Sequence, residues 1–162
     1  MKIAVIVLSY NAIKRIKPCL DSLFSQTYKG VYDVVVVDNN SGDGTADLVE
    51  QNYKEVILVR NKKNFGFAGG NNIGIHWAYS NGYDAIVLLN DDTKVRDTWL
   101  EELVKTTQQN SSAGLVMSKI LFADEAYRVN TIGNPLHFLA FSWSGGYKKL
   151  SSQFQIDVDV PV

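Results

Sequence analysis

The chain has 162 residues, of which 46% are hydrophobic and 20% are charged, and its formal net charge is -1 at pH 7. This length suits one globular domain with a substantial core, and the near-zero charge argues against a nucleic-acid-binding surface, which needs a basic excess. The one cysteine, Cys19, excludes an internal disulfide and is interpreted as a small core residue. The first apolar run is too short to span a membrane and lacks a signal-peptide cleavage site, so a cytoplasmic protein is expected.

Apolar runs alternate with helical patterns over the first two thirds of the chain. The predicted strands cover residues 2–8, 32–38, 56–59 and 85–89. The predicted helices end near Gln26, Tyr53, Ser80 and Gln109. This order predicts an α/β fold, in which a Rossmann-like, mostly parallel sheet is flanked by helices.

The pattern weakens after Gly114. Short strands are predicted at residues 115–117 and 120–122, and residues 156–162 alternate like a further strand. Because that apolar segment stops without a polar tail, we expect a natural chain that continues, and hence a fold truncated at its C-terminus.

A polar cluster follows each of the four predicted strands. The clusters are Ser9 to Asn11, Asp38 to Gly44, Asn61 to Gly70 and Asn90 to Thr93. Ligands of open parallel sheets bind beyond the carboxyl ends of the strands, where the strand order reverses. The clusters are therefore expected to converge on one edge of the sheet.

Asp91 and Asp92 follow the run Ala85 to Leu89, which is apolar enough to predict a buried strand. Adjacent carboxylates at the end of such a strand need a counter-charge, and oxygen ligands completed by phosphate oxygens suit Mg²⁺ or Mn²⁺. The alternative is a turn whose carboxylates are solvated.

The other clusters leave alternatives open. Asp38 is placed to meet a base or ribose, or else to form an Asx turn. The glycine-rich segment Asn64 to Asn72 opens a helix, whose free amides attract anions, or it is a plain tight turn. Lys14, Arg15 and Lys17 are most simply a solvated helix face.

Four segments together resemble the nucleotide-sugar-binding half of family 2 glycosyltransferases of GT-A fold, in the rhamnosyltransferase-like branch. These segments are Val7–Asn11, Val36–Thr45, Asn64–Gly74 and Leu88–Thr93. The resemblance implies that residues 1–117 form the donor-binding half. Residues 118–162 would then begin an incomplete acceptor-side half of the same domain.

The resemblance also implies a set of site residues. Asp92 would be the metal ligand, and Asn90 stands where the family's Asp-x-Asp motif begins with aspartate, so the site carries one negative charge fewer. The implied nucleotide-binding residues are Ser9, Tyr10, Asn11, Asp38, Asn40, Asn64, Gly69, Asn71, Asn90 and Asp91.

The implied reaction is metal-assisted, inverting transfer of a sugar from a UDP-, GDP- or dTDP-sugar to a saccharide or lipid-linked saccharide acceptor. The implied role is cell-surface polysaccharide synthesis, in the cytoplasm or in peripheral association with the inner membrane face. The resemblance places the general base beyond Val162. One alternative is a sugar-phosphate nucleotidyltransferase, which would want a glycine-rich basic loop where Ser9 to Ala12 stand. The other is a donor-binding module without turnover.

Overall fold

The computed structural model of the chain describes residues 1–133 and 144–154. The strand predicted at residues 156–162 lies outside this part. The chain forms two compact units, Met1–Glu101 and a second that begins at Glu102. The predicted division after residue 117 into donor and acceptor halves stays a prediction.

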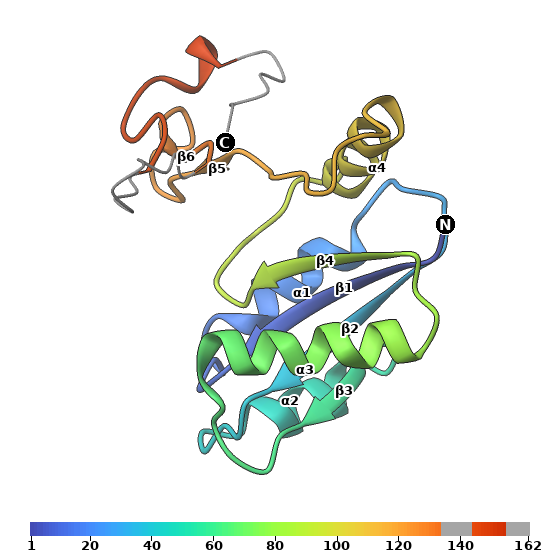
Figure 1. The fold of residues 1–162 in the computed structure, drawn as a ribbon. Coiled ribbons are helices and arrows are strands. Elements are labelled where there is room, and N and C mark those ends of the chain that lie inside the picture. Colours follow the sequence, from blue (N-terminus) through green and yellow to red (C-terminus); the bar gives the residue numbers. More distant parts are fainter. Residues whose placement is uncertain (134–143, 155–162) are drawn as a thin grey trace, which may run out of the picture. The chain divides into compact units, whose positions relative to one another are not determined.

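The first unit is built on a parallel sheet of four strands in the order β3-β2-β1-β4 (Figure 1). The strands are β1 (Ile3–Ser9), β2 (Tyr32–Asp38), β3 (Ile57–Arg60) and β4 (Ala85–Asn90). The chain moves outward from β1 through β2 to β3 and then crosses to β4 on the other side of β1. The strand order therefore reverses between β1 and its neighbours, which is where such sheets bind ligands.

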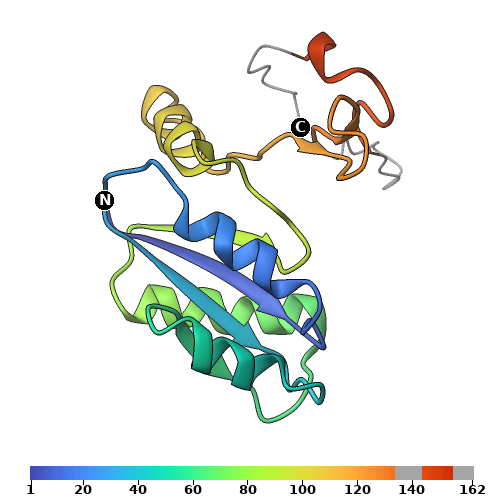
Figure 2. The same ribbon diagram turned by 180° about the vertical axis from the view of Figure 1, so that it is seen from behind.

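Helices cover both faces of this sheet, as predicted. α1 (Ile16–Phe24) and α2 (Thr45–Asn52) lie on one face, and α3 (Gly66–Ser80) lies on the other (Figures 1 and 2). Covering on both faces explains why β1 and the second half of β2 are continuous apolar runs and not alternating ones.

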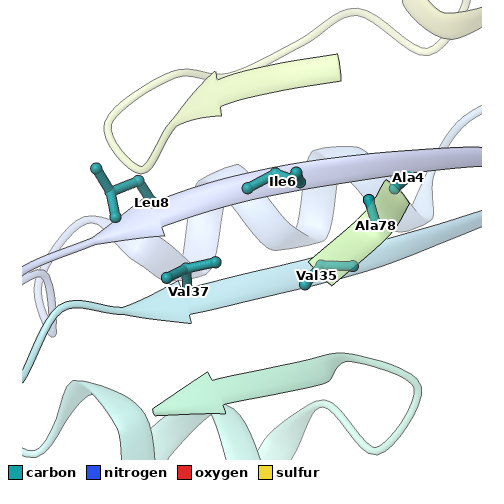
Figure 3. Packing of buried hydrophobic residues seen from close by; sticks show 6 residues of the cluster. All are labelled: Ala4, Ile6, Leu8, Val35, Val37 and Ala78. Atoms are coloured by element: carbon teal, nitrogen blue, oxygen red, sulfur yellow. The ribbon is translucent and has the colours of Figure 1, made fainter. Parts of the chain in front are cut away.

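The core between the sheet and α3 consists of side chains from two central strands and one helix. In Figure 3, Ile6 and Leu8 of β1 lie beside their register partners Val35 and Val37 of β2. Ala78 of α3 packs against this cluster. The small side chain at this helix position lets α3 lie close to the strands.

Three sequence-based expectations are wrong in detail. Within the part of the chain that the structure describes, β4 pairs only with β1 and lies at the edge of the sheet, and it is not fully buried, because Leu88 is 48% exposed. Residues 115–117 form no strand, and Leu115 is 92% exposed. α3 begins at Gly66, so part of the predicted glycine-rich loop is already the first turn of the helix.

The second unit contains a small antiparallel pair, β5 (Ile120–Leu121) and β6 (Val129–Thr131). α4 (Trp99–Gln109) leads into this unit, and the short 3-10 helix η1 (Ser151–Gln153) follows an isolated bridge between Arg128 and Leu150. Among the described residues, no helix combines the length and apolar character that crossing a bilayer requires.

Candidate functional site

A cavity of about 350 Å³ opens at the carboxyl edge of the four-stranded sheet. Its walls come from the segments that follow β1, β2, β3 and β4, so the four polar clusters do meet at one edge. The lining residues are Leu8, Tyr10, Arg15, Asn39, Asn64, Gly66, Phe67, Asn90, Asp91 and Asp92.

An ion pair between Arg15 and Asp91 joins two walls of this cavity. The Arg15 Nε donates to Asp91 Oδ1 at 2.8 Å, and an Nη donates to Asp91 Oδ2 at 3.3 Å. The same guanidinium donates to the carbonyl oxygens of Tyr10 and Asn11, at 3.0 and 3.1 Å. Arg15 is therefore part of the cavity wall, and the expectation that it is only a solvated helix residue is wrong.

Asp92 differs from its neighbour in both exposure and pairing. Its side chain is exposed and lines the cavity, and within the part of the chain that the structure describes, its carboxylate has no hydrogen bond or ion pair. Asp91 is 7% exposed and is neutralised by Arg15. Both carboxylates line the cavity, but Asp91 is bound to Arg15 whereas Asp92 is open to a ligand.

This donor set can hold a divalent cation only if a bound ligand supplies part of the coordination. The described residues contain no group of three or more His, Cys, Asp or Glu side chains that could hold a metal ion. One or two carboxylates completed by phosphate oxygens and water is nevertheless a common coordination of Mg²⁺. Asp92 would hold the ion, and a bound diphosphate would supply further oxygens.

Asn39 joins the segment after β2 to the segment after β3. Its side-chain oxygen accepts hydrogen bonds from Asn61 Nδ2 and from the backbone N–H of Phe65, at 3.1 and 3.0 Å. Its side-chain nitrogen donates to Asn64 Oδ1 and to the carbonyl of Gly66, at 2.9 and 3.1 Å. Asn39 is 2% exposed, and the segment after β3 supplies partners for both donors and both acceptor positions of its buried amide.

Further hydrogen bonds join the segment after β1 to the segment after β2. The backbone N–H groups of Asn11, Ala12 and Ile13 donate to side-chain oxygens of Ser41, Thr45 and Asp43, at 2.9, 2.9 and 3.1 Å. Burial favours a higher pKa for Asp43, but the hydrogen bonds that its carboxylate accepts lower its pKa overall. This carboxylate therefore stays ionised as an anchor of the loop.

Asp38 does not line the cavity. One carboxylate oxygen accepts a hydrogen bond at 3.0 Å from the backbone N–H of Ser41, three residues along the chain. The other is buried and has no partner in the described residues, and the same holds for the Oγ of Ser9, its register partner. The expected contact of Asp38 with a base stays a prediction.

The predicted site residues thus divide into two groups. Those that line the cavity are Tyr10, Asn64, Asn90, Asp91 and Asp92. The others, which do not line it, are Ser9, Asn11, Asp38, Asn40, Gly69 and Asn71. Asn71, for example, donates to the carbonyl of Phe67 within α3, at 3.1 Å.

Sequence reasoning missed five cavity residues as site residues: Leu8, Arg15, Asn39, Gly66 and Phe67. Phe67 was the easiest to find, because an aromatic ring beside glycines in a polar segment has no obvious core to enter, and it is 67% exposed. Arg15 and Asn39 owe their positions to partners distant in sequence, which no local pattern reveals.

Cys19 lies beneath the exit of β4. It is 1% exposed, as its assignment to the core requires, and its Sγ lies 3.6 Å from the carbonyl oxygen of Asn90. Burial, together with the negative charges of Asp91 and Asp92, raises the pKa of the thiol to about 12. Cys19 therefore stays protonated at neutral pH and is not a nucleophile.

Comparison with known proteins assigns the family. The family described as Glycosyl transferase family 2 matches residues 4–157. This chain belongs to glycosyltransferase family 2. The resemblance found in the four polar segments is thereby confirmed.

Two curated relatives illustrate the match. Glycosyltransferase AglE of Haloferax volcanii is 34% identical over 108 residues, which are 64% of this chain and 34% of AglE. An uncharacterized glycosyltransferase of Haemophilus influenzae is 30% identical over 111 residues, 67% of this chain and 33% of that protein. The chain thus spans about a third of the length of these relatives.

Solved structures of the same fold include enzymes with bound nucleotides. The mannosyltransferase PcManGT of Pyrobaculum calidifontis, in complex with GDP-Man and Mn²⁺, is 27% identical with a TM-score of 0.61, over 77% of this chain and 37% of that one. S. aureus TarS 1-349 with UDP-GlcNAc is 23% identical with a TM-score of 0.61, over 75% of this chain and 40% of that one. The likeness to TarS supports the GT-A fold alone.

Proposed function

We propose that this chain forms the donor site of a metal-assisted, inverting glycosyltransferase. The site binds the nucleoside diphosphate part of a UDP-, GDP- or dTDP-sugar. The observation that carries the proposal is the cavity itself, because four segments distant in sequence line it and the unpaired carboxylate of Asp92 faces it.

Each wall of the cavity has chemistry suited to one part of such a donor. The exposed ring of Tyr10, the Leu8 side chain and the ring of Phe67 offer apolar surfaces to a base or sugar. Asn64 and Asn90 offer amides for sugar hydroxyl groups. Asp38 would hold the base edge after a local shift of the segment that contains Ser41, which would give its unpartnered oxygen a donor.

Asp92 would hold Mg²⁺ or Mn²⁺ against the diphosphate. Such an ion neutralises the negative charge that develops on the leaving diphosphate. The bound GDP-Man and Mn²⁺ of the mannosyltransferase PcManGT support this assignment. We propose a saccharide or lipid-linked saccharide as the acceptor, in cell-surface polysaccharide synthesis at the cytoplasmic side of the membrane.

Isothermal titration calorimetry with UDP, GDP and dTDP, each with and without Mn²⁺, tests the proposal. One of the three is expected to bind below millimolar concentration, and Mn²⁺ is expected to tighten that binding. Absence of binding by all three contradicts the proposal. Release of pyrophosphate from a nucleoside triphosphate and a sugar phosphate would instead favour a nucleotidyltransferase.

A further inference from the structure

We propose that Arg15 sets the metal affinity of the site. By pairing with Asp91 it leaves Asp92 as the one free carboxylate among the described residues that line the cavity, so that the chain binds a divalent cation only together with the diphosphate of the donor. The inference rests on the proposed donor site, and it assigns Arg15 as a positioning residue, since its side chain acts through Asp91.

The geometry of the ion pair indicates that Arg15 and Asp91 stay paired in the folded chain. Two nitrogens of one guanidinium donate to the two oxygens of one carboxylate, which is the forked arrangement that arginine forms with carboxylates. The remaining bonds of Arg15, to the carbonyls of Tyr10 and Asn11, fix the guanidinium to the segment after β1. The backbone N–H of Tyr10 also points to Asp91 Oδ2, at 3.4 Å.

Asp91 is more deeply buried than Arg15, and its negative charge therefore depends more on its partner. The side chain of Asp91 is 9% exposed, whereas that of Arg15 is 47% exposed. A buried carboxylate without a counter-charge is costly, so Asp91 needs a cation nearby. Arg15 satisfies this need within the protein, and a metal ion would have to compete with it.

The charge of the cavity follows from this pairing. Its charged lining residues are Arg15, Asp91 and Asp92. The three charged side chains leave one net negative charge, because Asn90 adds none. A single free carboxylate binds Mg²⁺ or Mn²⁺ weakly, and phosphate oxygens must complete the coordination. The metal is therefore expected to enter with the nucleotide.

Titration of the folded chain with Mn²⁺ alone, followed by electron paramagnetic resonance, tests the inference without any nucleotide. The parent chain is expected to bind Mn²⁺ weakly. Arg15→Met removes the cation and frees Asp91, which should tighten Mn²⁺ binding about tenfold. The double variant Arg15→Met/Asp91→Asn should return to the weak binding of the parent chain.

A residue with a merely structural role would not produce a gain of metal binding that a second substitution cancels. Tight Mn²⁺ binding by the parent chain, or a folded Arg15→Met variant with unchanged affinity, overturns the inference. Circular dichroism establishes that each variant is folded.

If Arg15→Met does not fold, the variant Asp91→Asn tests the proposed role of Arg15. It leaves no buried charge unpaired, because Arg15 is half exposed, and it frees the guanidinium for the diphosphate. Binding of UDP or GDP without metal, whichever binds the parent chain more tightly, should strengthen about threefold. Unchanged or weaker binding contradicts the role of Arg15. Failure of the proposed function appears separately, as a parent chain that binds no nucleoside diphosphate.

Discussion

At the scale of single residues, the side chain of Asn39 supplies hydrogen bonds to the segment after β3, as strand pairing does elsewhere in the sheet. The segment after β3 is not a strand, so side chains supply part of its backbone hydrogen bonding. A carboxamide offers two acceptor positions and two donors, and here all four are used. A carboxylate or a hydroxyl at this position could not satisfy the same set, because neither has this balance of donors and acceptors.

Asn39→Ala should therefore destabilise the first unit. It leaves the Phe65 N–H and the Gly66 carbonyl without their partner, which predicts a loss of about 2–4 kcal/mol in the free energy of unfolding, measured by urea denaturation. Asn40→Gly is the matched control. Asn40 is exposed with a φ of 66°, a conformation that glycine adopts easily, so its effect should stay within about 0.5 kcal/mol. Equal losses in the two variants would contradict the role of Asn39.

Asp92 and Asp38 should separate metal binding from nucleoside binding. Asp92→Ala removes an exposed and unpaired carboxylate, so the fold is kept and only the Mn²⁺ enhancement of nucleoside diphosphate binding is lost. Asp38→Ala should weaken binding even without metal. Calorimetry on both variants checks this, and an Asp92→Ala variant that still responds to Mn²⁺ as the parent does would refute the metal assignment.

Cys19 should make stability fall at alkaline pH. Its pKa is 9.0 as an ordinary thiol and about 12 in the folded chain. Above pH 9 the unfolded chain loses this proton while the folded chain keeps it, so rising pH favours unfolding. Relative to Cys19→Ala, the free energy of unfolding should fall by about 1.4 kcal/mol for each pH unit above 9. Urea denaturation of both proteins at pH 8.5 and pH 10.5 measures the difference, and parallel pH profiles would contradict it.

At the scale of elements, the sequence predicts whether a segment is a helix or a strand better than it predicts which strands lie next to one another. The runs in β1 and β2 are apolar because helices cover both faces of the sheet, as the sequence predicts. The run in β4 looks the same, yet β4 is an edge strand with Leu88 half exposed. Strand order depends on contacts between distant segments, so composition alone cannot reveal which run is central. The strand prediction for the apolar residues 115–117 was wrong for a related reason, since a strand requires a pairing partner.

Gly74 determines how closely α3 lies against the sheet. A Cβ there would lie 2.6 Å from Ile6 Cγ2 and 3.1 Å from Val37 Cγ2. Both side chains are fully buried and cannot yield. Gly74→Ala should therefore cost about 1–2 kcal/mol of stability by thermal or urea unfolding, despite the better helix propensity of alanine. Gly42→Ala, where a Cβ meets nothing within 4 Å, should be nearly neutral. A stabilised Gly74→Ala variant would refute the packing argument.

At the scale of the whole first unit, the meeting of the four polar segments could be predicted from the sequence, but their connections could not. Parallel strands end at one edge, so polar residues after each strand had to gather there. The partners within that edge depend on contacts such as Arg15 with Asp91, 76 residues apart. For the same reason no local pattern shows that Asp91 pairs with Arg15, and only the resemblance to the family distinguished Asp92 from its neighbour.

These connections predict that ligand binding protects the site as one cooperative unit. Residues 10–15, 39–45, 61–67 and 90–93 are joined through Asn39, Asp43 and the Arg15–Asp91 pair. A ligand that binds only the folded site stabilises it by about 2.7 kcal/mol at a concentration of 100 times Kd. Amide hydrogen exchange should therefore slow in all four segments, with the same dependence on nucleoside diphosphate concentration.

Residues 79–84 are the internal control for this experiment. They include the end of α3 and the start of the turn into β4, at the opposite edge of the sheet, where Asp84 binds the backbone of Lys2. Their local opening does not involve the cavity, so their exchange should change little at low saturation. Protection confined to one of the four segments, or protection at residues 79–84 with none at 90–93, would show that the polar clusters do not act as one binding site.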